Sequence, residues 1–283
     1  MLRVQNLNFH YKKGTFLFES LNLNLLPGNI YGLLGKNGAG KTTLLKILCG
    51  LLFPKQGECS FNGFKPMERN PEFLSDLFFV PDSFYLPKVK IPQYVKLYSP
   101  FYPKFNHVKF ASYLNQFEVS ADAKLNSLSY GQKKKFLIAF ALATDASLIL
   151  LDEPTNGLDI PSKSAFRKII SSVTTDEKII IISTHQVRDM KNLIDPIIIL
   201  DGGKIVLNHS MGEIGERIMM SFRPDEPKEG EVLYYEPTMG GYAVLEENKP
   251  GIENEVDLEL LANLASANKG AVEKLFEEVV YEK

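Results

Sequence analysis

Short apolar runs and one alternating segment mark the first two thirds of the chain. Residues 21–25 alternate leucine with asparagine, which is the period of a strand with one buried face. Residues 30–34, 147–151 and 179–183 are almost continuously apolar, as is typical of strands buried on both faces of a parallel sheet. A helical pattern at 162–173 separates the last two runs. This order predicts an α/β fold in which a crossover helix joins parallel strands.

The stretch from about residue 84 to 143 has a different character. Prolines break its first part into short pieces, and helical patterns follow at 108–117 and 131–143. We therefore expect a mostly helical insert in the α/β unit. Further along, the apolar run at 196–200 and the segment 204–207 flank an Asp-Gly-Gly turn, which predicts a terminal hairpin.

Charge divides the chain near residue 208. Residues 209–283 hold 7 Lys/Arg and 17 Asp/Glu, whereas the whole chain holds 32 and 34 and has a net charge of -2. Such a step suggests a boundary between a main unit, residues 1–208, and an accessory region, residues 209–283. The acidity of that region argues against binding to nucleic acid. The lysines at 133–135 are expected to form only the solvated face of a helix.

The accessory region has structure signals of its own. Segments 231–235 and 242–245 flank a Gly-Gly pair and predict two strands, while 256–267 and 271–280 have helical patterns. We expect a small α+β extension. It either forms a dimerising or regulatory domain or only caps the core of the main unit.

Composition excludes several classes of protein. Cys49 and Cys59 have neither the spacing of a metal site nor partners for a disulfide framework, so we expect small buried thiols. The N-terminus lacks an apolar core of signal-peptide length. No apolar run approaches the roughly 20 residues that span a bilayer. The sequence thus predicts no signal peptide and no transmembrane segment.

The strongest chemical motif follows the run at 30–34. The sequence GKNGAGKT, which ends at Thr42, matches the phosphate-binding P-loop, with a predicted strand before it and a predicted helix after it. Backbone N–H groups are expected to wrap the phosphates of ATP, Lys41 to reach the β- and γ-phosphates, and the Thr42 hydroxyl to ligate Mg²⁺. The residues expected to bind the nucleotide here are Gly35, Lys36, Asn37, Gly38, Ala39, Gly40, Lys41, Thr42 and Thr43.

A second motif ends the run at 147–151. Asp152 and Glu153 follow it directly, which predicts that Asp152 lies at the carboxyl edge of the sheet beside the P-loop. There Asp152 can hold Mg²⁺, and Glu153 is suited to orient and deprotonate an attacking water. The two motifs together predict an ATPase.

Three further motifs, in this order, resemble those of ATP-binding cassette (ABC) ATPases. Leu-Ser-Tyr-Gly-Gln at 128–132 is similar to the family's signature motif, and Pro-Thr-Asn-Gly-Leu-Asp at 154–159 is similar to its D-loop. Ser-Thr-His at 183–185 ends a predicted strand, as the family's switch histidine does. The resemblance covers about residues 1–208. It implies a P-loop NTPase core of ABC type with an antiparallel β subdomain and with the insert at 84–143 as its helical subdomain.

The resemblance also implies a site shared between two cassettes. Ser129 and Gly131 stand where a helix is predicted to begin, so that a hydroxyl and free N–H groups can bind a γ-phosphate. In the family these residues, with the position of Gln132, contact the ATP of the partner cassette. Hydrolysis would then require a dimer of cassettes, formed by two identical chains or by two different ones.

Other roles follow from the same resemblance. His185 would contact the γ-phosphate and steady the attacking water, so that the expected catalytic residues are Lys41, Glu153 and His185. Asp159 would couple the two sites across the dimer. Tyr11 would provide the ring on which adenine stacks, although an ordinary tyrosine at a strand end is the alternative.

Two positions depart from the family pattern. The signature motif has Tyr130 where glycine is commonest, and we expect this position to point outward with little effect. Asp82 stands where the family usually has glutamine; it keeps an oxygen for Mg²⁺ or water but adds a charge. The segment 97–105 and the acid at Asp82 are both similar to a subset of export-type cassettes.

These features predict the ATP-binding and hydrolysing subunit of an ABC transporter, most simply an exporter. Its expected cofactor is Mg²⁺ with ATP, and its expected partners are separate polytopic membrane subunits and a second cassette. We expect it to be peripheral, at the cytoplasmic face of the cell membrane. The alternative is a soluble ABC ATPase that acts in translation or cluster assembly.

Overall fold

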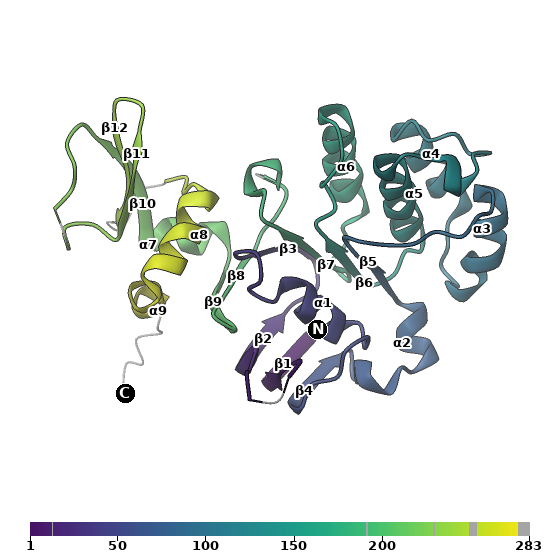
Figure 1. Ribbon diagram of the computed structural model, residues 1–283, viewed down its shortest axis with the longest axis horizontal. Helices are drawn as coiled ribbons and strands as arrows, with labels where there is room; N and C mark the ends of the chain where they lie inside the picture. Colours follow the sequence, from purple (N-terminus) through teal and green to yellow (C-terminus); the bar gives the residue numbers. More distant parts are fainter. Residues whose placement is uncertain (13, 191, 229, 249–253, 277–283) are drawn as a thin grey trace.

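The computed structural model describes residues 1–12, 14–190, 192–228, 230–248 and 254–276. Over these residues the molecule is layered around one mixed sheet, with an antiparallel sheet below it, helices above it and a C-terminal region beside it (Figure 1). The helical insert and the C-terminal region lie at opposite ends of the molecule. This arrangement leaves the carboxyl ends of the central strands between the two ends.

The central sheet has six strands within the described residues, in the order β5-β6-β7-β3-β8-β9. β5 to β8 are parallel to their neighbours, and β9 is antiparallel to β8. The bounds are β3 Asn29–Leu34, β5 Leu77–Val80, β6 Leu148–Asp152, β7 Ile179–Thr184, β8 Ile197–Asp201 and β9 Lys204–His209. The three continuous apolar runs are therefore buried parallel strands, and the predicted terminal hairpin is confirmed.

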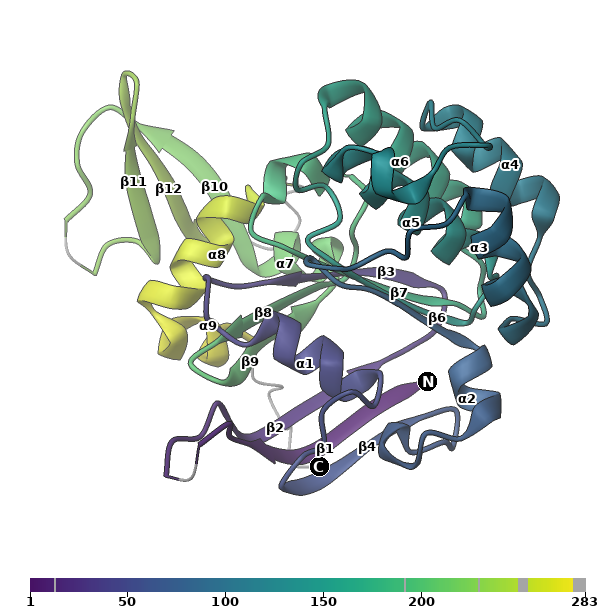
Figure 2. The same ribbon diagram turned by 45° about the vertical axis from the view of Figure 1, so that its right-hand side comes forward.

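A second, antiparallel sheet lies below the central one, with α1 (Lys41–Leu48) between them (Figure 2). Its strands have the order β2-β1-β4, with bounds β1 Leu2–Phe9, β2 Phe18–Leu25 and β4 Gln56–Phe61. Leu21, Leu23 and Leu25 point into the layer that this sheet shares with α1. The alternating pattern thus marks a half-buried strand, as predicted.

The segment between β5 and β6 is helical, as predicted. It contains α3 Ile91–Tyr98, α4 His107–Gln116 and α5 Tyr130–Ala143, while α6 Ile160–Val173 crosses from β6 to β7. α5 and α6 cover the upper face of the central sheet (Figures 1 and 2). The remaining elements before β8 are the short α2 Pro71–Ser75 and the 3₁₀ turns η1 Pro66–Glu68, η2 Ser99–Phe101, η3 Leu125–Ser127 and η4 Val187–Met190.

One sequence expectation about α5 was wrong. Lys134 and Lys135 are buried, whereas the run of lysines at 133–135 was expected to be a solvated helix face. α5 is nearly enclosed, because residues from Phe136 to Ala143 are buried on all sides. The two lysines turn inward and bond to groups on neighbouring segments.

The C-terminal region is α+β, as predicted, although two of its elements were not foreseen. Its elements are α7 Met211–Arg217, β10 Ile218–Arg223, β11 Tyr234–Thr238, β12 Gly241–Glu247, α8 Leu258–Ala267 and α9 Lys269–Phe276. β12 lies between β10 and β11 in an antiparallel sheet. The strand predicted at 231–235 lies three residues later, because β11 pairs with β12 across the Thr238/Gly241 turn. The end of the helix predicted at 271–280 lies outside the described residues.

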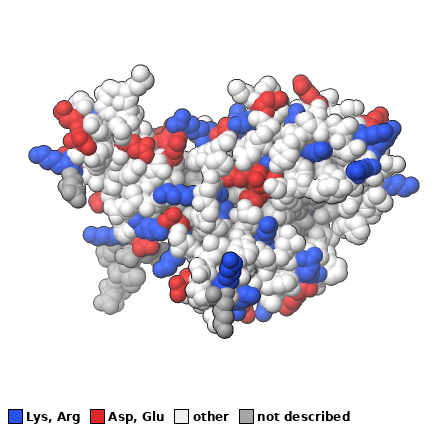
Figure 3. Space-filling model, in the orientation of Figure 1, with Lys and Arg blue, Asp and Glu red and all other residues white. Residues whose placement is uncertain are grey.

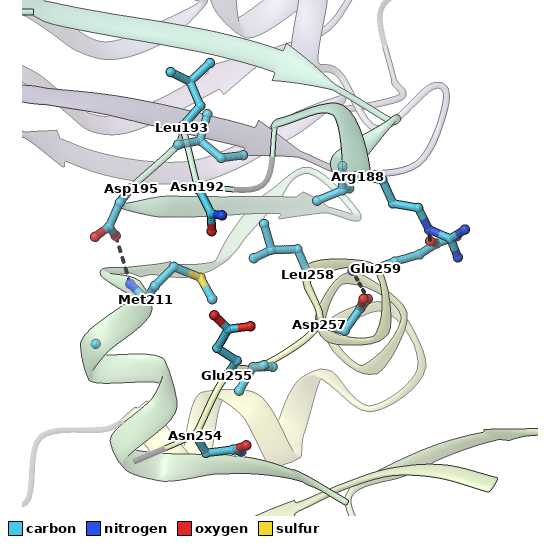
Figure 4. Close-up of a pocket in the computed structure, with 14 residues that line it drawn as sticks. Arg188, Asn192, Leu193, Asp195, Met211, Asn254, Glu255, Asp257, Leu258 and Glu259 are labelled. Carbon is cyan, nitrogen blue, oxygen red and sulfur yellow. Dashed lines mark hydrogen bonds and ion pairs between the residues drawn. The ribbon is translucent and has the colours of Figure 1, made fainter. Parts of the chain in front are cut away.

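The C-terminal region packs on the edge of the central sheet. Buried residues of α7, β12 and α8 belong to the same apolar cluster as those of α5 and α6. Arg188 beyond β7 pairs with Glu259 of α8 at 2.8 Å, and the Asp195 carboxylate accepts the Met211 N–H at 2.8 Å (Figure 4). In Figure 3, Asp and Glu side chains gather over the C-terminal sheet at the upper left, while Lys and Arg predominate at the right-hand edge.

No helix in the described part of the chain has the length and apolar character that a membrane span requires.

Candidate functional site

The P-loop connects β3 to α1, as the sequence predicts. Gly40 caps α1 with φ 108°, a left-handed conformation that favours glycine, and a Cβ there would lie 2.7 Å from the Phe18 ring. A Cβ at Gly35 would overlap the Leu200 carbonyl oxygen. These glycines let the backbone follow a tight path that leaves the first N–H groups of α1 free for an anion.

Lys41 begins α1 and its ammonium folds over this loop. Its Nζ donates to the Gly35 carbonyl at 2.7 Å and lies 3.9 Å from Oε1 of Glu153. Burial lowers the Lys41 pKa, while the negative charges of Glu153 and Asp152 act in the opposite direction. The Lys41 side chain thus lies over the phosphate-binding loop.

Asp152 ends β6 and is fully buried beside the P-loop. One carboxylate oxygen accepts the Thr42 hydroxyl at 2.7 Å, and the other accepts the Ser183 hydroxyl at 2.5 Å. Hydroxyl and carboxylate oxygens are the ligands that Mg²⁺ prefers, and Mg²⁺ is commonly held by few protein oxygens together with phosphates. Thr42 and Asp152 fit that pattern, because a hydroxyl oxygen and a carboxylate oxygen lie 2.7 Å apart beside the P-loop.

Glu153 follows with a left-handed backbone, φ 46°, which is uncommon outside glycine. Its N–H donates to the Ser183 carbonyl at 3.0 Å, so the turn is tied to β7. Its carboxylate lies 2.8 Å from Nδ1 of His185, the residue after β7. Lys41, Glu153 and His185, predicted separately from the sequence, therefore meet at one point.

A cleft of about 660 Å³ opens at this point. Its walls come from the P-loop, the loop between β1 and β2, the segment after β5 and the segments that follow β6 and β7. The residues that line it are Tyr11, Leu17, Lys36, Asn37, Gly38, Gly40, Lys41, Thr42, Thr43, Asp82, Glu153, Asn156 and His185. The Tyr11 hydroxyl bonds the Thr43 hydroxyl at 2.9 Å, and the largely exposed Tyr11 ring stands at the rim.

The signature residues do not line this cleft. Ser129 caps α5: its hydroxyl accepts the Gln132 N–H at 3.2 Å, and its own N–H donates to the Gln132 side chain at 3.1 Å. Ser129 is exposed, and a Cβ at Gly131 would lie 2.7 Å from the Gly157 carbonyl. Asp159 caps α6, and its hydrogen bonds from Ser162 lower its pKa.

Several residues at the site carry no obvious sequence signal. Ser183 could have been inferred, because it lies beside Asp152 once β6 and β7 pair in parallel register. Leu17 and Asn156 line the cleft without a motif of their own. Lys134 could not be found from helical periodicity, since it interrupts the apolar pattern of α5.

A second cavity, of about 490 Å³, lies between η4 and the start of α8 (Figure 4). Its wall combines apolar side chains, such as Met211 and Leu258, with Asp195, Asp257 and Glu259. It contains no residue of the P-loop, whose residues line the first cleft.

Comparison with known proteins points to one family of ATP-binding proteins. The family model described as ABC transporter matches residues 18–156. The SkfA peptide export ATP-binding protein SkfE of Bacillus subtilis is 34% identical over 212 residues, which cover 73% of this chain and 87% of SkfE. The molybdate import ATP-binding protein MolC of Haemophilus influenzae is 34% identical over 190 residues, which cover 65% of this chain and 73% of MolC.

A solved structure extends the comparison to the fold. The ATP-binding cassette MJ0796, described as a dimer in a post-hydrolysis state bound to ADP and Pi, superposes with a TM-score of 0.65 at 25% identity. The match covers 74% of this chain and 98% of that cassette. The chain therefore belongs to the ABC transporter ATP-binding proteins, and it is an ATPase that serves as the ATP-binding subunit of a transporter.

Proposed function

We propose that this chain powers an exporter, by hydrolysing Mg-ATP between two cassettes that act on separate membrane subunits. The observation that carries the chemistry is the meeting of Lys41, Glu153 and His185 beside the Thr42–Asp152 pair. Residues 1–208 would form the ATPase domain, with the helical subdomain at about 84–143. Residues 209–283 would form an accessory region that covers the edge of the central sheet.

Each residue of the cleft has a role in this proposal. The P-loop N–H groups and Lys41 bind the phosphates, and Thr42 and Asp152 would hold Mg²⁺, with Asp82 facing the same cleft. The ion would neutralise charge on the phosphates. Glu153 accepts a proton from water, whose oxygen attacks the γ-phosphorus as the bond to ADP breaks.

His185 is placed to orient that water. Its ring nitrogen is 2.8 Å from Glu153, and its side chain is partly open to the cleft. A fixed imidazole beside the base reduces the positions that the water can take, which favours in-line attack.

Two observations support a second cassette. Ser129 and Gly131 are absent from the cleft that holds Lys41, so within one chain the signature motif faces outward. The similar cassette MJ0796 is described as dimeric. A second cassette, identical or different, would bring its signature motif over the nucleotide.

The membrane partner and the direction of transport rest on other features. Tyr85, Leu97 and Phe101 are large apolar side chains that the helical insert leaves exposed, a surface suited to a protein partner. SkfE is named for export, and MolC for import. We favour export because Asp82 and the segment 97–105 follow the export-type pattern. A site at the cytoplasmic face of the membrane follows from this role, and the names of both relatives favour transport over the soluble alternative.

A Glu153→Gln variant tests the proposal. Without a base, the chain should bind ATP with near wild-type affinity but hydrolyse it about 10²-fold or more slowly. It should also accumulate as an ATP-loaded dimer, measured by size-exclusion chromatography with light scattering. Glu177→Gln, an exposed acid before β7, is the matched control and should hydrolyse ATP normally.

The same variant tests the transport role. Captured with ATP from detergent-solubilised membranes of its source, it should bring a polytopic membrane protein with it. Normal hydrolysis by Glu153→Gln would refute the assignment of the base. Recovery with cytosolic partners alone would leave the ATPase intact and refute the membrane role.

A further inference from the structure

Lys134 is a fully buried lysine of α5 that contacts segments lining the cleft, and no motif assigns it a function. Its side chain is 0% exposed. Its ammonium donates to the Glu153 carbonyl at 2.6 Å, to the Asp82 carboxylate at 3.2 Å and to the Asn156 carbonyl at 3.4 Å. A buried ammonium is stable only when such partners replace water. One residue of α5, the signature helix that begins within the signature motif, thus contacts the segments after β5 and β6.

The contact with Glu153 falls where the backbone most needs support. A non-glycine residue in the left-handed region is strained and persists only where its surroundings fix it. Hydrogen bonds hold Glu153 on both sides: its N–H donates to Ser183, and its carbonyl accepts from the Lys134 ammonium and from the Asn156 N–H at 3.2 Å. Together they set the direction of the carboxylate toward His185.

The two departures from the ABC pattern meet at the same lysine. The Tyr130 hydroxyl donates to the Asp82 carbonyl, and the Tyr130 ring lies 5.6 Å from the Lys134 ammonium. Tyr130 also stacks on Phe84 at 5.4 Å. The acid at position 82 therefore has a charge partner on α5, and the tyrosine at position 130 anchors the backbone of that acid.

We propose that Lys134 is a positioning residue of the ATPase, which holds the Glu153 turn in its active shape and is itself held by Asp82 and Tyr130. We call the three mutually contacting residues Asp82, Tyr130 and Lys134 the clasp. Through the Lys134–Glu153 hydrogen bond, the clasp connects the signature helix to the residue that carries the catalytic carboxylate. This proposal rests on the assignment of Glu153 as the base. It explains the acid at position 82 as the counter-charge of a buried lysine.

The decisive comparison is Lys134→Met against Lys178→Met in the full chain. Lys178 is a buried lysine of matched surroundings, with its ammonium 2.5 Å from the Asp145 carboxylate and 3.1 Å from the Val173 carbonyl, at the opposite end of β7 from His185. Both variants should lower the urea midpoint of unfolding. Only Lys134→Met should lower kcat, by about 10²-fold, the scale expected when a reacting group is displaced by about 1 Å.

The affinity for nucleotide distinguishes a displaced catalytic residue from a site that is disrupted as a whole. Lys134→Met should keep the KM for ATP and the affinity for a fluorescent ATP analogue within about threefold of wild type, because Lys41 and the P-loop are untouched. An unchanged kcat, or a loss of binding as large as the loss of kcat, would overturn the proposal. The wild-type rate and Glu153→Gln test the base independently, so the two failures are distinguishable.

Asp82→Asn remains measurable if Lys134→Met does not fold, and a urea midpoint and kcat equal to those of the wild type would then overturn the proposal. It removes the counter-charge but leaves the Lys134–Glu153 bond, so it should lower the urea midpoint and reduce kcat by only a few fold. The double variant Asp82→Asn, Lys134→Met should be more stable than the sum of the single losses predicts, because neither charge is then left alone. Additive losses in this cycle would show that the two residues do not act as a pair and would overturn the clasp.

Discussion

At the scale of single residues, the site depends on the hydroxyl groups that hydrogen-bond a buried carboxylate. Asp152 is inaccessible to water, and its two oxygens accept hydroxyl donors from Thr42 and Ser183. A buried charge without such donors is strongly unfavourable. Ser183 also accepts the Glu153 N–H at 3.2 Å, so one hydroxyl serves both acids.

Ser183→Ala should therefore destabilise the chain. The loss of a hydrogen bond to a buried carboxylate is expected to cost about 1.5–3 kcal/mol. Urea unfolding followed by circular dichroism measures this. Ser172→Ala is the control, since the exposed Ser172 hydroxyl bonds only its own helix, at the Ile169 carbonyl, and its loss should stay within about 0.5 kcal/mol. Equal losses in the two variants would contradict the role of Ser183.

The motif residues of the cleft could be predicted because their chemistry requires fixed spacing. Asp152 ends a strand, and Lys41, Thr42, Glu153 and His185 come after strand ends. Parallel strands bring those ends to one edge of the sheet. The supporting contacts could not be predicted in this way. That Lys134 turns inward depends on the packing of α5 against its neighbours, which a run of three lysines does not reveal.

At the scale of elements, the start of β7 is joined to the loop after α5 by Lys178 and Asp145. Burial raises the pKa of Asp145. The hydrogen bond from Lys178 and the positive charges of Lys178, Lys109 and Lys104 together lower this pKa by more, so the net shift is downward. A carboxyl whose pKa is lower in the folded chain stabilises the fold above the pKa of the unfolded chain. That stability is lost as the pH falls through the folded pKa.

The Lys178–Asp145 ion pair should therefore stop stabilising the fold at acidic pH. At pH 6 Asp145 is charged in both states, so Lys178→Met should unfold at clearly lower urea concentration than the wild type. The difference should shrink below about pH 4, near the ordinary pKa of an aspartate, as Asp145 takes up a proton and the ion pair is lost. Urea midpoints of both chains from pH 3 to 6 provide the measurement. A difference that is constant with pH would show that only the Val173 contact matters.

Element prediction succeeded where burial gives a clear period. The parallel strands are continuous apolar runs, and β2 alternates, because their faces are wholly or half enclosed. β10 was missed because its residues after Ile218 are mostly half-buried and show no clear alternation. Its residues pair with residues of β12 that lie 19 to 29 positions further along the chain, and a local sequence pattern does not reveal such a contact.

At the scale of the whole molecule, the C-terminal region is a cover over the sheet edge. The charge step near residue 208 falls at the end of β9, the last strand of the central sheet. Beyond it, Ile214, Leu261 and Leu264 are fully buried in the cluster that continues under α5 and α6. Removal of the region would expose this apolar surface. Of the two roles that the sequence left open, the shared core therefore favours a region that caps the main unit.

The incomplete cleft leads to a prediction for the assembled protein. Within one chain Lys41 and Glu153 line the cleft but Ser129 does not, so a site completed by a second copy would need residues from both. Lys41→Ala and Ser129→Arg should each be inactive alone, the first through loss of the charge that binds phosphate and the second through a bulky side chain at the signature motif.

Mixing these two variants in equal amounts should restore part of the wild-type ATPase rate. A mixed dimer contains one site in which Lys41 comes from the Ser129→Arg chain and Ser129 comes from the Lys41→Ala chain, and that site is intact. The control is Lys41→Ala mixed with the double variant, in which no intact site can form and the rate should stay at background. Recovery in the first mixture alone identifies a homodimer with shared sites. No recovery, with both variants folded, would mean that the signature motif acts within its own chain or toward a different cassette.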